Sequence, residues 1–191
     1  ALRLVFASVI IAPAALGSAR TRKELRALSG RDMAMLLMAG IFLFLHFTLW
    51  ISSLYFTGVA KSVVLVTTSP IFITLYSILF FGERVGKTFW TGLIISLAGA
   101  LILGWNNLMG GGFEWRGDIL ALSGAVSVAG YFLIGSRLRK KLSLLSYIFP
   151  VYSVSAVMLA GTAFVTGHSL TGWHYNTYLF CFLMAVVCQL I

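Results

Sequence analysis

The chain has 191 residues, of which 60% are hydrophobic and 10% are charged, and its formal net charge at pH 7 is +9. This composition excludes an ordinary soluble globular domain and indicates a membrane protein. Because a charged side chain at the centre of a membrane-spanning helix costs roughly 2.5–3.5 kcal/mol, the charges should lie in the loops between the spans.

Apolar segments without Lys, Arg, Asp or Glu follow one another along the chain. They cover residues 4–19, 33–60, 62–82, 88–113, 119–136 and 142–191. A helix needs about 20 apolar residues to cross the hydrocarbon core. The last segment is long enough for two spans, divided at residues 166–176, where glycines, polar residues and interfacial aromatic residues gather. We therefore expect seven spans, the first and last incomplete, in a fragment of a longer chain.

The basic residues divide unevenly between alternate loops. Eleven of the 14 Lys and Arg residues lie in loops 18–32, 83–87 and 137–143, whereas Arg3, Lys61 and Arg116 lie on the other side. By the positive-inside rule, the first three loops are predicted to be cytoplasmic. This asymmetry accounts for the net charge, so we expect no nucleic acid as a partner. Anionic lipid headgroups are the expected neighbours of these loops.

The second span carries a polar stripe. His46, Trp50, Ser53 and Thr57 recur at intervals of four, three and four, which places them on one helix face. His46 is the only ionisable side chain well inside a span, and such a group is a candidate functional residue. Burial favours its neutral form. Two interpretations stay open: a structural histidine bonded to a neighbouring helix, and a residue that handles substrate or protons.

The third span contains a proline among hydroxyl side chains. Its polar face consists of Thr67, Pro70, Thr74 and Ser77, with Thr68 beside them. Pro70 has no amide hydrogen and therefore leaves the carbonyl of Val66 without a helical partner. Irregular backbone at membrane depth is tolerated where it is buried in protein or lines a wet cavity. The pattern favours a substrate path, and the alternative is that these hydroxyls bond between helices, worth about 0.6 kcal/mol on average.

The next two spans carry different patterns. The fourth has small residues at strict intervals of four, namely Gly92, Ser96, Ala100 and Gly104. This spacing lets helices approach closely and predicts a packing role. The fifth span has a third polar stripe, formed by Ser123, Ser127 and Tyr131.

Signals for catalysis or metal binding are absent from the sequence. No Asp or Glu lies inside a predicted span, and no nucleophile elbow or HExxH motif occurs. His168 and His174 have no Cys or acidic residue at ligand spacing. Cys181 and Cys188 lie too far apart along one helix for a disulfide. We therefore expect no enzyme, no metal site and no cofactor.

Three segments together resemble a known family. They are "LHFTLWISSLYFTGVAKSVVLVTTSPIF", "FFGERVGKTFWTGLIISLAGALILG" and "GDILALSGAVSVAGYFLIGSRLRKKLSLLSYIFPVY". In order and spacing they resemble the EamA-type branch of the bacterial drug/metabolite transporter superfamily. The resemblance implies an all-α polytopic transmembrane helical bundle with an inverted-repeat ten-helix fold, of which this chain supplies spans two to eight. Residues 1–105 would belong to the first half, 106–116 to an outer connector and 117–191 to the second half.

The resemblance and the polar stripes together predict a secondary transporter of the bacterial inner membrane. We expect it to export small organic metabolites, such as amino acids, related compounds or drugs, by alternating access around a midplane cavity. The expected lining residues are His46, Trp50, Ser53, Thr67, Thr68, Pro70, Thr74, Ser127 and Tyr131. The expected partners are a small-molecule substrate, membrane lipids and protons that couple through His46; a homo-oligomer is left open. The alternatives are a channel-like facilitator of the same fold, and a scaffold or sensor that transports nothing.

Overall fold

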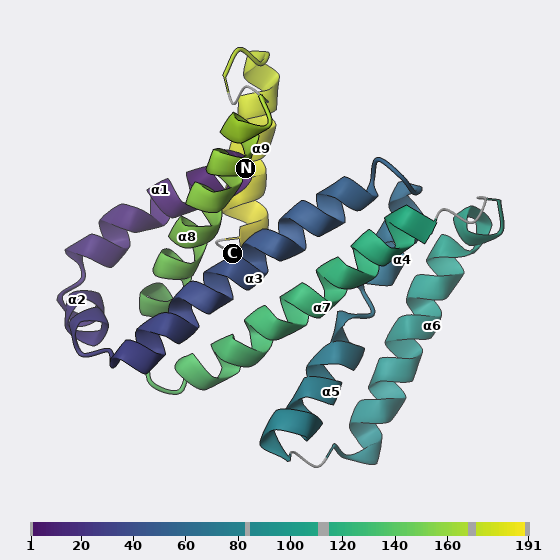
Figure 1. Ribbon diagram of the computed structural model, residues 1–191, viewed down its shortest axis with the longest axis horizontal. Coiled ribbons are helices and arrows are strands. Elements are labelled where there is room, and N and C mark those ends of the chain that lie inside the picture. Colours follow the sequence, from purple (N-terminus) through teal and green to yellow (C-terminus); the bar gives the residue numbers. More distant parts are fainter. Residues whose placement is uncertain (1, 83–84, 111–114, 168–170, 190–191) are drawn as a thin grey trace. The chain divides into compact units, whose positions relative to one another are not determined.

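The computed structural model describes residues 2–82, 85–110, 115–167 and 171–189. Glu83, Arg84 and His168 lie outside the described residues, as do the side chains of Ala100 and Cys188 and the burial of Gly104. Throughout the described ranges the regular structure is α-helical and contains no strand, which confirms the predicted all-α class (Figure 1). The chain forms two compact units, one of Ala1–Phe44 with Ile134–Ile191 and one of Leu45–Leu133. The predicted halves, 1–105 and 117–191, stay a prediction.

The first unit is built around α1 (Leu2–Gly17) and α8 (Leu144–Val165). It also contains α2 (Ala19–Arg26), α9 (Tyr175–Gln189), the beginning of α3 (Gly30–Ser53) and the end of α7 (Trp115–Leu138). Leu4, Ala7, Ile11 and Ala15 are buried on one face of α1, as the helical repeat requires. α1 packs against α8 and α9, and Phe6 meets Phe182 of α9 edge to face at 6.1 Å.

Residues 18–32, predicted as a cytoplasmic loop between two spans, contain the short helix α2, which the sequence pattern did not predict. α2 turns away from α1 by 91°, and the backbone N–H of Thr21 donates to Ser18 Oγ at its start. A carboxylate oxygen of Glu24 accepts the backbone N–H of Ser143 at 2.7 Å, just before α8 begins. The Arg20 guanidinium, followed by this N–H, lowers the pKa of Glu24 to about 2. Specific side-chain bonds therefore anchor the polar helix α2 on α8, which its loop-like composition does not show.

The second unit contains the rest of α3, then α4 (Val59–Val66), α5 (Ser69–Phe81), α6 (Lys87–Gly110) and the first part of α7. α4 packs against α6, and Val64 of α4 and Leu93 of α6 are buried. α5 ends at Phe81, and the next residue, Gly82, caps it with a φ of 62°, a left-handed conformation that glycine adopts without steric cost.

Several of these helices are long and apolar enough to cross a membrane. By length and hydropathy four segments qualify among the described residues: Gly30–Ser53, Val59–Phe80, Trp115–Leu138 and Leu144–Val165. The bent pair α1 and α2 would make a fifth, and Tyr175–Val187 is a shorter apolar helix. The chain is therefore a multi-pass membrane protein, while the count of seven spans stays a prediction.

Candidate functional site

His46 connects α3 to α7 within the second unit. Its side chain is 7% exposed, and Nδ1 lies 2.9 Å from the carbonyl oxygen of Gly124. Because a carbonyl can only accept, Nδ1 carries the proton in this bond. A Cβ at Gly124 would lie 3.5 Å from the His46 carbonyl oxygen, so the two helices are already in close contact. The bond is the one that the structural interpretation of His46 expects, and a role in substrate or proton handling stays a prediction.

Trp50 continues the same face of α3 and forms an aromatic cluster with His46. The two rings stack with centroids 5.7 Å apart and an interplanar angle of 22°, and Phe47 lies 5.0 Å from the His46 ring. Trp50 Nε1 is buried and has no hydrogen-bond partner among the described residues. A buried donor without a partner costs roughly 1–3 kcal/mol. This N–H is therefore available to an acceptor that the described residues do not supply.

Ser53 connects α3 to α4. Its Oγ donates to the Trp50 carbonyl at 2.6 Å and lies 2.6 Å from Ser62 Oγ. A hydroxyl has one hydrogen, so Ser62 must be the donor in the second bond. Both serines are 0% exposed. In this structure Ser53 holds two helices together, and its predicted place in the cavity lining stays a prediction.

A buried charge cluster lies next to this point and was not foreseen. Lys61 Nζ pairs with Asp118 Oδ2 at 2.8 Å, and the two side chains are 12% and 17% exposed. Thr57 Oγ1 donates to Asp118 Oδ1 at 3.4 Å. Gly117 lets α7 approach, because a Cβ there would lie 2.7 Å from Thr57 Cβ. The available signal was two opposite charges, each beside the start of a predicted span.

The helix break around Pro70 accounts for the hydroxyl-rich sequence there. α4 ends at Val66 and α5 begins at Ser69, so Pro70 occupies the first turn of α5, where its missing N–H leaves no helical bond unmade. The two intervening hydroxyls donate to nearby carbonyls, Thr67 Oγ1 to Val64 at 2.7 Å and Thr68 Oγ1 to Leu65 at 2.6 Å. The backbone at this depth is thus irregular, and its polar groups are partly satisfied by side chains.

The remaining candidate residues lie along their own helices. Thr74 is buried and donates to the Pro70 carbonyl at 2.8 Å, and Ser127 is buried and donates to the Ser123 carbonyl at 2.8 Å. Tyr131 is half-buried, with its ring 5.1 Å from that of Phe132. The structure thus brings His46, Trp50 and Gly124 together, whereas the hydroxyls of Thr67, Thr68, Thr74 and Ser127 bond locally.

The small-residue stripe on α6 is exposed where the structure describes its side chains. Gly92 and Ser96 face open space, and no heavy atom lies within 4 Å of a Cβ built at Gly92. Its packing role stays a prediction. Within the described residues, no group of three or more His, Cys, Asp or Glu side chains could hold a metal ion.

Comparison with known proteins identifies related chains. Residues 1–105 match the model of the EamA-like transporter family. The chain is 35% identical over 105 residues to the uncharacterized transporter YdfC of Bacillus subtilis (strain 168), which covers 53% of this chain and 33% of the relative. It is 32% identical over 129 residues to a riboflavin transporter of Rhizobium johnstonii, which covers 63% of this chain and 41% of the relative. The chain thus spans less than half the length of these two relatives, and no solved structure matches it.

Proposed function

This chain belongs to the EamA-like transporter family, and we propose that it forms part of a secondary transporter that exports a small organic metabolite across the bacterial inner membrane. The family and the names of the relatives point to a transporter and not to an enzyme. Export and alternating access follow the family resemblance. The observation that carries the proposal is the break at Thr67 and Thr68, inside the 22-residue apolar segment Val59–Phe80. Irregular backbone in such a segment suits a wet cavity.

The chemistry around Trp50 suggests what kind of solute would fit. The Trp50 ring, which stacks on the buried ring of His46, would offer a solute a flat apolar wall, and the buried Trp50 N–H needs an acceptor. Binding sites for small molecules commonly combine such walls with a few polar groups that fix orientation. We therefore propose a flat organic solute with a hydrogen-bond acceptor at its edge. The riboflavin transporter among the relatives supports a heteroaromatic compound as the first one to test.

Cysteine labelling tests the cavity in the full-length protein. We expect single cysteines at Thr67 and Thr68 to react with a membrane-impermeant thiol reagent, after Cys181 and Cys188 have been replaced by serine. The matched control is Leu79→Cys on α5, a side chain 67% exposed in the described structure and expected to face lipid. It should stay unlabelled. Protection of Thr67→Cys and Thr68→Cys to the level of Leu79→Cys would remove the cavity from the proposal.

The transport mode is tested by flux measurements on proteoliposomes. A carrier should give a saturating flux that is accelerated when the same solute is present on the opposite side. A channel-like facilitator would give a linear flux without this acceleration, and a scaffold or sensor would give none. Riboflavin and two amino acids are the first solutes to measure.

We further propose that His46 couples transport to a proton gradient. Replacing His46 with Gln removes a titratable ring but keeps a donor for the Gly124 carbonyl. We expect the response of flux to an imposed pH difference to fall at least tenfold while flux without a gradient continues. His174→Gln, at an exposed position, is the control and should keep the wild-type response. A pH response in His46→Gln equal to that of His174→Gln would contradict coupling through this residue.

A further inference from the structure

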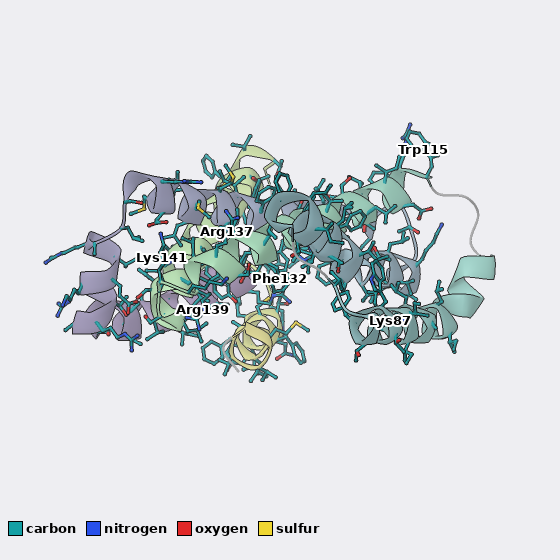
Figure 2. All side chains as sticks on the ribbon, turned by 90° about the horizontal axis from the view of Figure 1, so that it is seen from below. Lys87, Trp115, Phe132, Arg137, Arg139 and Lys141 are labelled. Atoms are coloured by element: carbon teal, nitrogen blue, oxygen red, sulfur yellow. The ribbon has the colours of Figure 1, made fainter. Side chains whose placement is uncertain are left out.

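A basic pocket lies in the first unit, where α3 begins and α7 ends. It has a volume of about 360 Å³ and is lined by two segments far apart in the sequence, 29–35 and 137–141. Four of its lining side chains are basic, namely Arg31, Arg137, Lys140 and Lys141, and one, Asp32, is acidic. Figure 2 labels Arg137 and Lys141 near the end of α7, together with Arg139. The pocket therefore has an excess of positive charge.

The two segments of the pocket are held together by an ion pair. Lys141 Nζ contacts both carboxylate oxygens of Asp32, at 2.9 and 3.0 Å. This pair neutralises the one acidic side chain, so that the positive charges of Arg31 and Lys140 can attract an anion. Ser29 Oγ accepts the backbone N–H of Asp32 at 3.1 Å at the beginning of α3, so the positive end of that helix dipole also lies at the pocket.

An apolar stripe leads away from the pocket along α3. Arg31, Met35 and Met38 recur at intervals of four and three, which places them on one helix face. Arg31 and Met35 line the pocket, and Met38 is 51% exposed. Seven residues of helix span about 10 Å. A ligand with a negative headgroup and an apolar tail would match this face, because its headgroup would lie at Arg31 and its tail along Met35 and Met38.

We propose that this pocket binds the headgroup of an anionic phospholipid in the cytoplasmic leaflet, with one acyl chain along Met35 and Met38. The phosphate lies beside Arg31 and Lys140. Basic pockets between spanning helices on the cytoplasmic side suit such headgroups, and this side is the one predicted by the distribution of basic residues. The stripe favours a lipid over a soluble phosphate, because a free anion would gain nothing from the half-buried Met35 and the exposed Met38.

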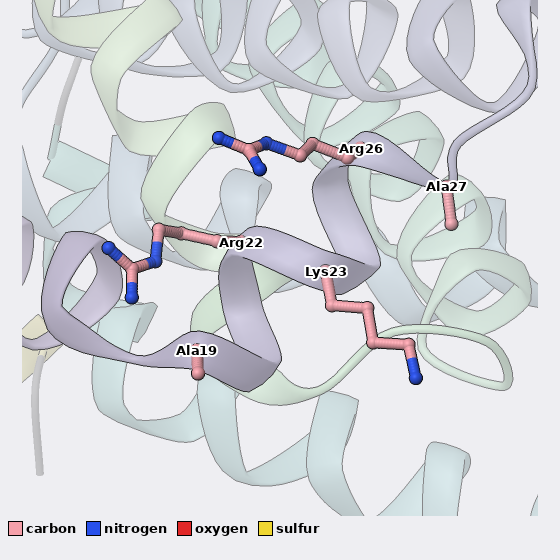
Figure 3. A pocket seen from close by; sticks show the side chains of 5 residues that line it. All are labelled: Ala19, Arg22, Lys23, Arg26 and Ala27. Carbon is pink, nitrogen blue, oxygen red and sulfur yellow. The ribbon is translucent and has the colours of Figure 1, made fainter.

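The helix α2 offers a matched control with equal charge. Arg22, Lys23 and Arg26 line another pocket of about 530 Å³, but all of its lining residues come from α2 and the residue after it. Figure 3 shows the side chains of Arg22 and Lys23 pointing to different sides of the helix. Arg22 and Lys23 do not converge on one position, so this pair should attract anionic lipid only as separate charges.

The test is lipid titration of the full-length protein in detergent, followed by native mass spectrometry. The probes are cardiolipin, phosphatidylglycerol, zwitterionic phosphatidylethanolamine and inorganic phosphate. We expect the two anionic lipids to bind at least tenfold more tightly than phosphatidylethanolamine. One basic side chain near an anionic surface is worth roughly fivefold in affinity, so Arg31→Gln/Lys140→Gln should weaken cardiolipin binding about thirtyfold. Arg22→Gln/Lys23→Gln should weaken it less than threefold, and Arg31→Lys/Lys140→Arg should preserve it.

Three results would overturn the proposal. The first is an equal loss of affinity in the α2 variant, which would indicate general charge attraction. The second is binding of phosphatidylethanolamine as tight as that of cardiolipin. The third is displacement of bound lipid by millimolar inorganic phosphate, which would indicate a soluble anion as the ligand. If the double glutamine variant does not purify as a monodisperse protein, the single variants Arg31→Gln and Lys140→Gln, each expected to lose about fivefold, decide the question.

Discussion

At the scale of single residues, ion pairs fix the positions of the acidic side chains. Each of the three acidic side chains in the described part of the chain has a basic partner: Glu24 with Arg20, Asp32 with Lys141, and Asp118 with Lys61. The pairs differ in how much water reaches them. Arg20 and Lys141 are 77% and 62% exposed, whereas both members of the Lys61–Asp118 pair are mostly buried. Exposed pairs contribute about 0–1 kcal/mol, and a buried charge that loses its partner costs much more.

This difference gives a prediction for two equivalent changes. Asp118→Asn leaves the Lys61 ammonium largely buried without a counter-charge, so we expect the unfolding free energy to fall by about 2 kcal/mol, somewhat less than for a fully buried pair. Asp32→Asn removes a pair whose partner is exposed to water and should lower the unfolding free energy distinctly less than Asp118→Asn. Denaturation of the purified protein in detergent measures both. Lys61→Met/Asp118→Leu should recover part of the loss, and equal effects of Asp118→Asn and Asp32→Asn would contradict the assignment.

At the scale of helices, glycines decide which contacts can be close. A Cβ at Gly117 would lie 2.9 Å from the backbone nitrogen of Thr57, and one at Gly40 would lie 2.7 Å from Val154 Cβ. Because the contact at Gly117 is with the backbone of Thr57, it cannot be relieved by a small movement of a flexible side chain. Gly92, which the sequence pattern marks for close packing, has no such neighbour. The spacing of small residues thus identifies glycines at which a neighbouring helix could approach closely. It does not show at which of them a helix of this chain does so.

Two alanine substitutions test this distinction. Gly117→Ala should destabilise the protein by about 1–3 kcal/mol, because added atoms in a packed contact force the backbone to shift. Gly92→Ala should leave stability unchanged or raise it by up to about 1 kcal/mol, since alanine has the higher helix propensity. Thermal unfolding in detergent reports both. Destabilisation by Gly92→Ala would mean that the α6 stripe packs against a further helix or a second copy, as its spacing predicts.

Local sequence patterns predicted some of the helix boundaries and missed others. Pro70 and its hydroxyl neighbours predicted irregular backbone, and the structure places the break at Thr67 and Thr68, so that Pro70 lies in the first turn of α5. The helix α2 was missed because its residues are almost all polar. Its stability comes from Ser18 at its start and from the Glu24 bond to Ser143, 119 residues away. No periodicity of apolar residues could have indicated it.

At the scale of the whole molecule, the arrangement across the membrane gives the sharpest prediction. In a variant without Cys181 and Cys188, a single cysteine at Ala27 should be shielded from a membrane-impermeant thiol reagent applied outside intact cells. Cysteines at Tyr55 and Tyr175, side chains that are 81% and 71% exposed, should react. The physical reason is that loops rich in Lys and Arg stay in the cytoplasm. Labelling of Ala27→Cys from outside would reverse the predicted orientation.

The sequence by itself determined that this is a multi-pass helical membrane protein with a strong bias of basic residues to one side, and its quoted segments pointed to the family. These properties depend on the cost of placing each residue in hydrocarbon, which acts locally and can be read along the chain. The tertiary structure decided the partners of His46 and Asp118, the anchoring of α2 and the basic pocket beside Arg31. Such contacts join residues as much as 78 or 119 positions apart. They depend on how each helix is rotated and how closely its neighbours approach, and packing over the whole chain sets both.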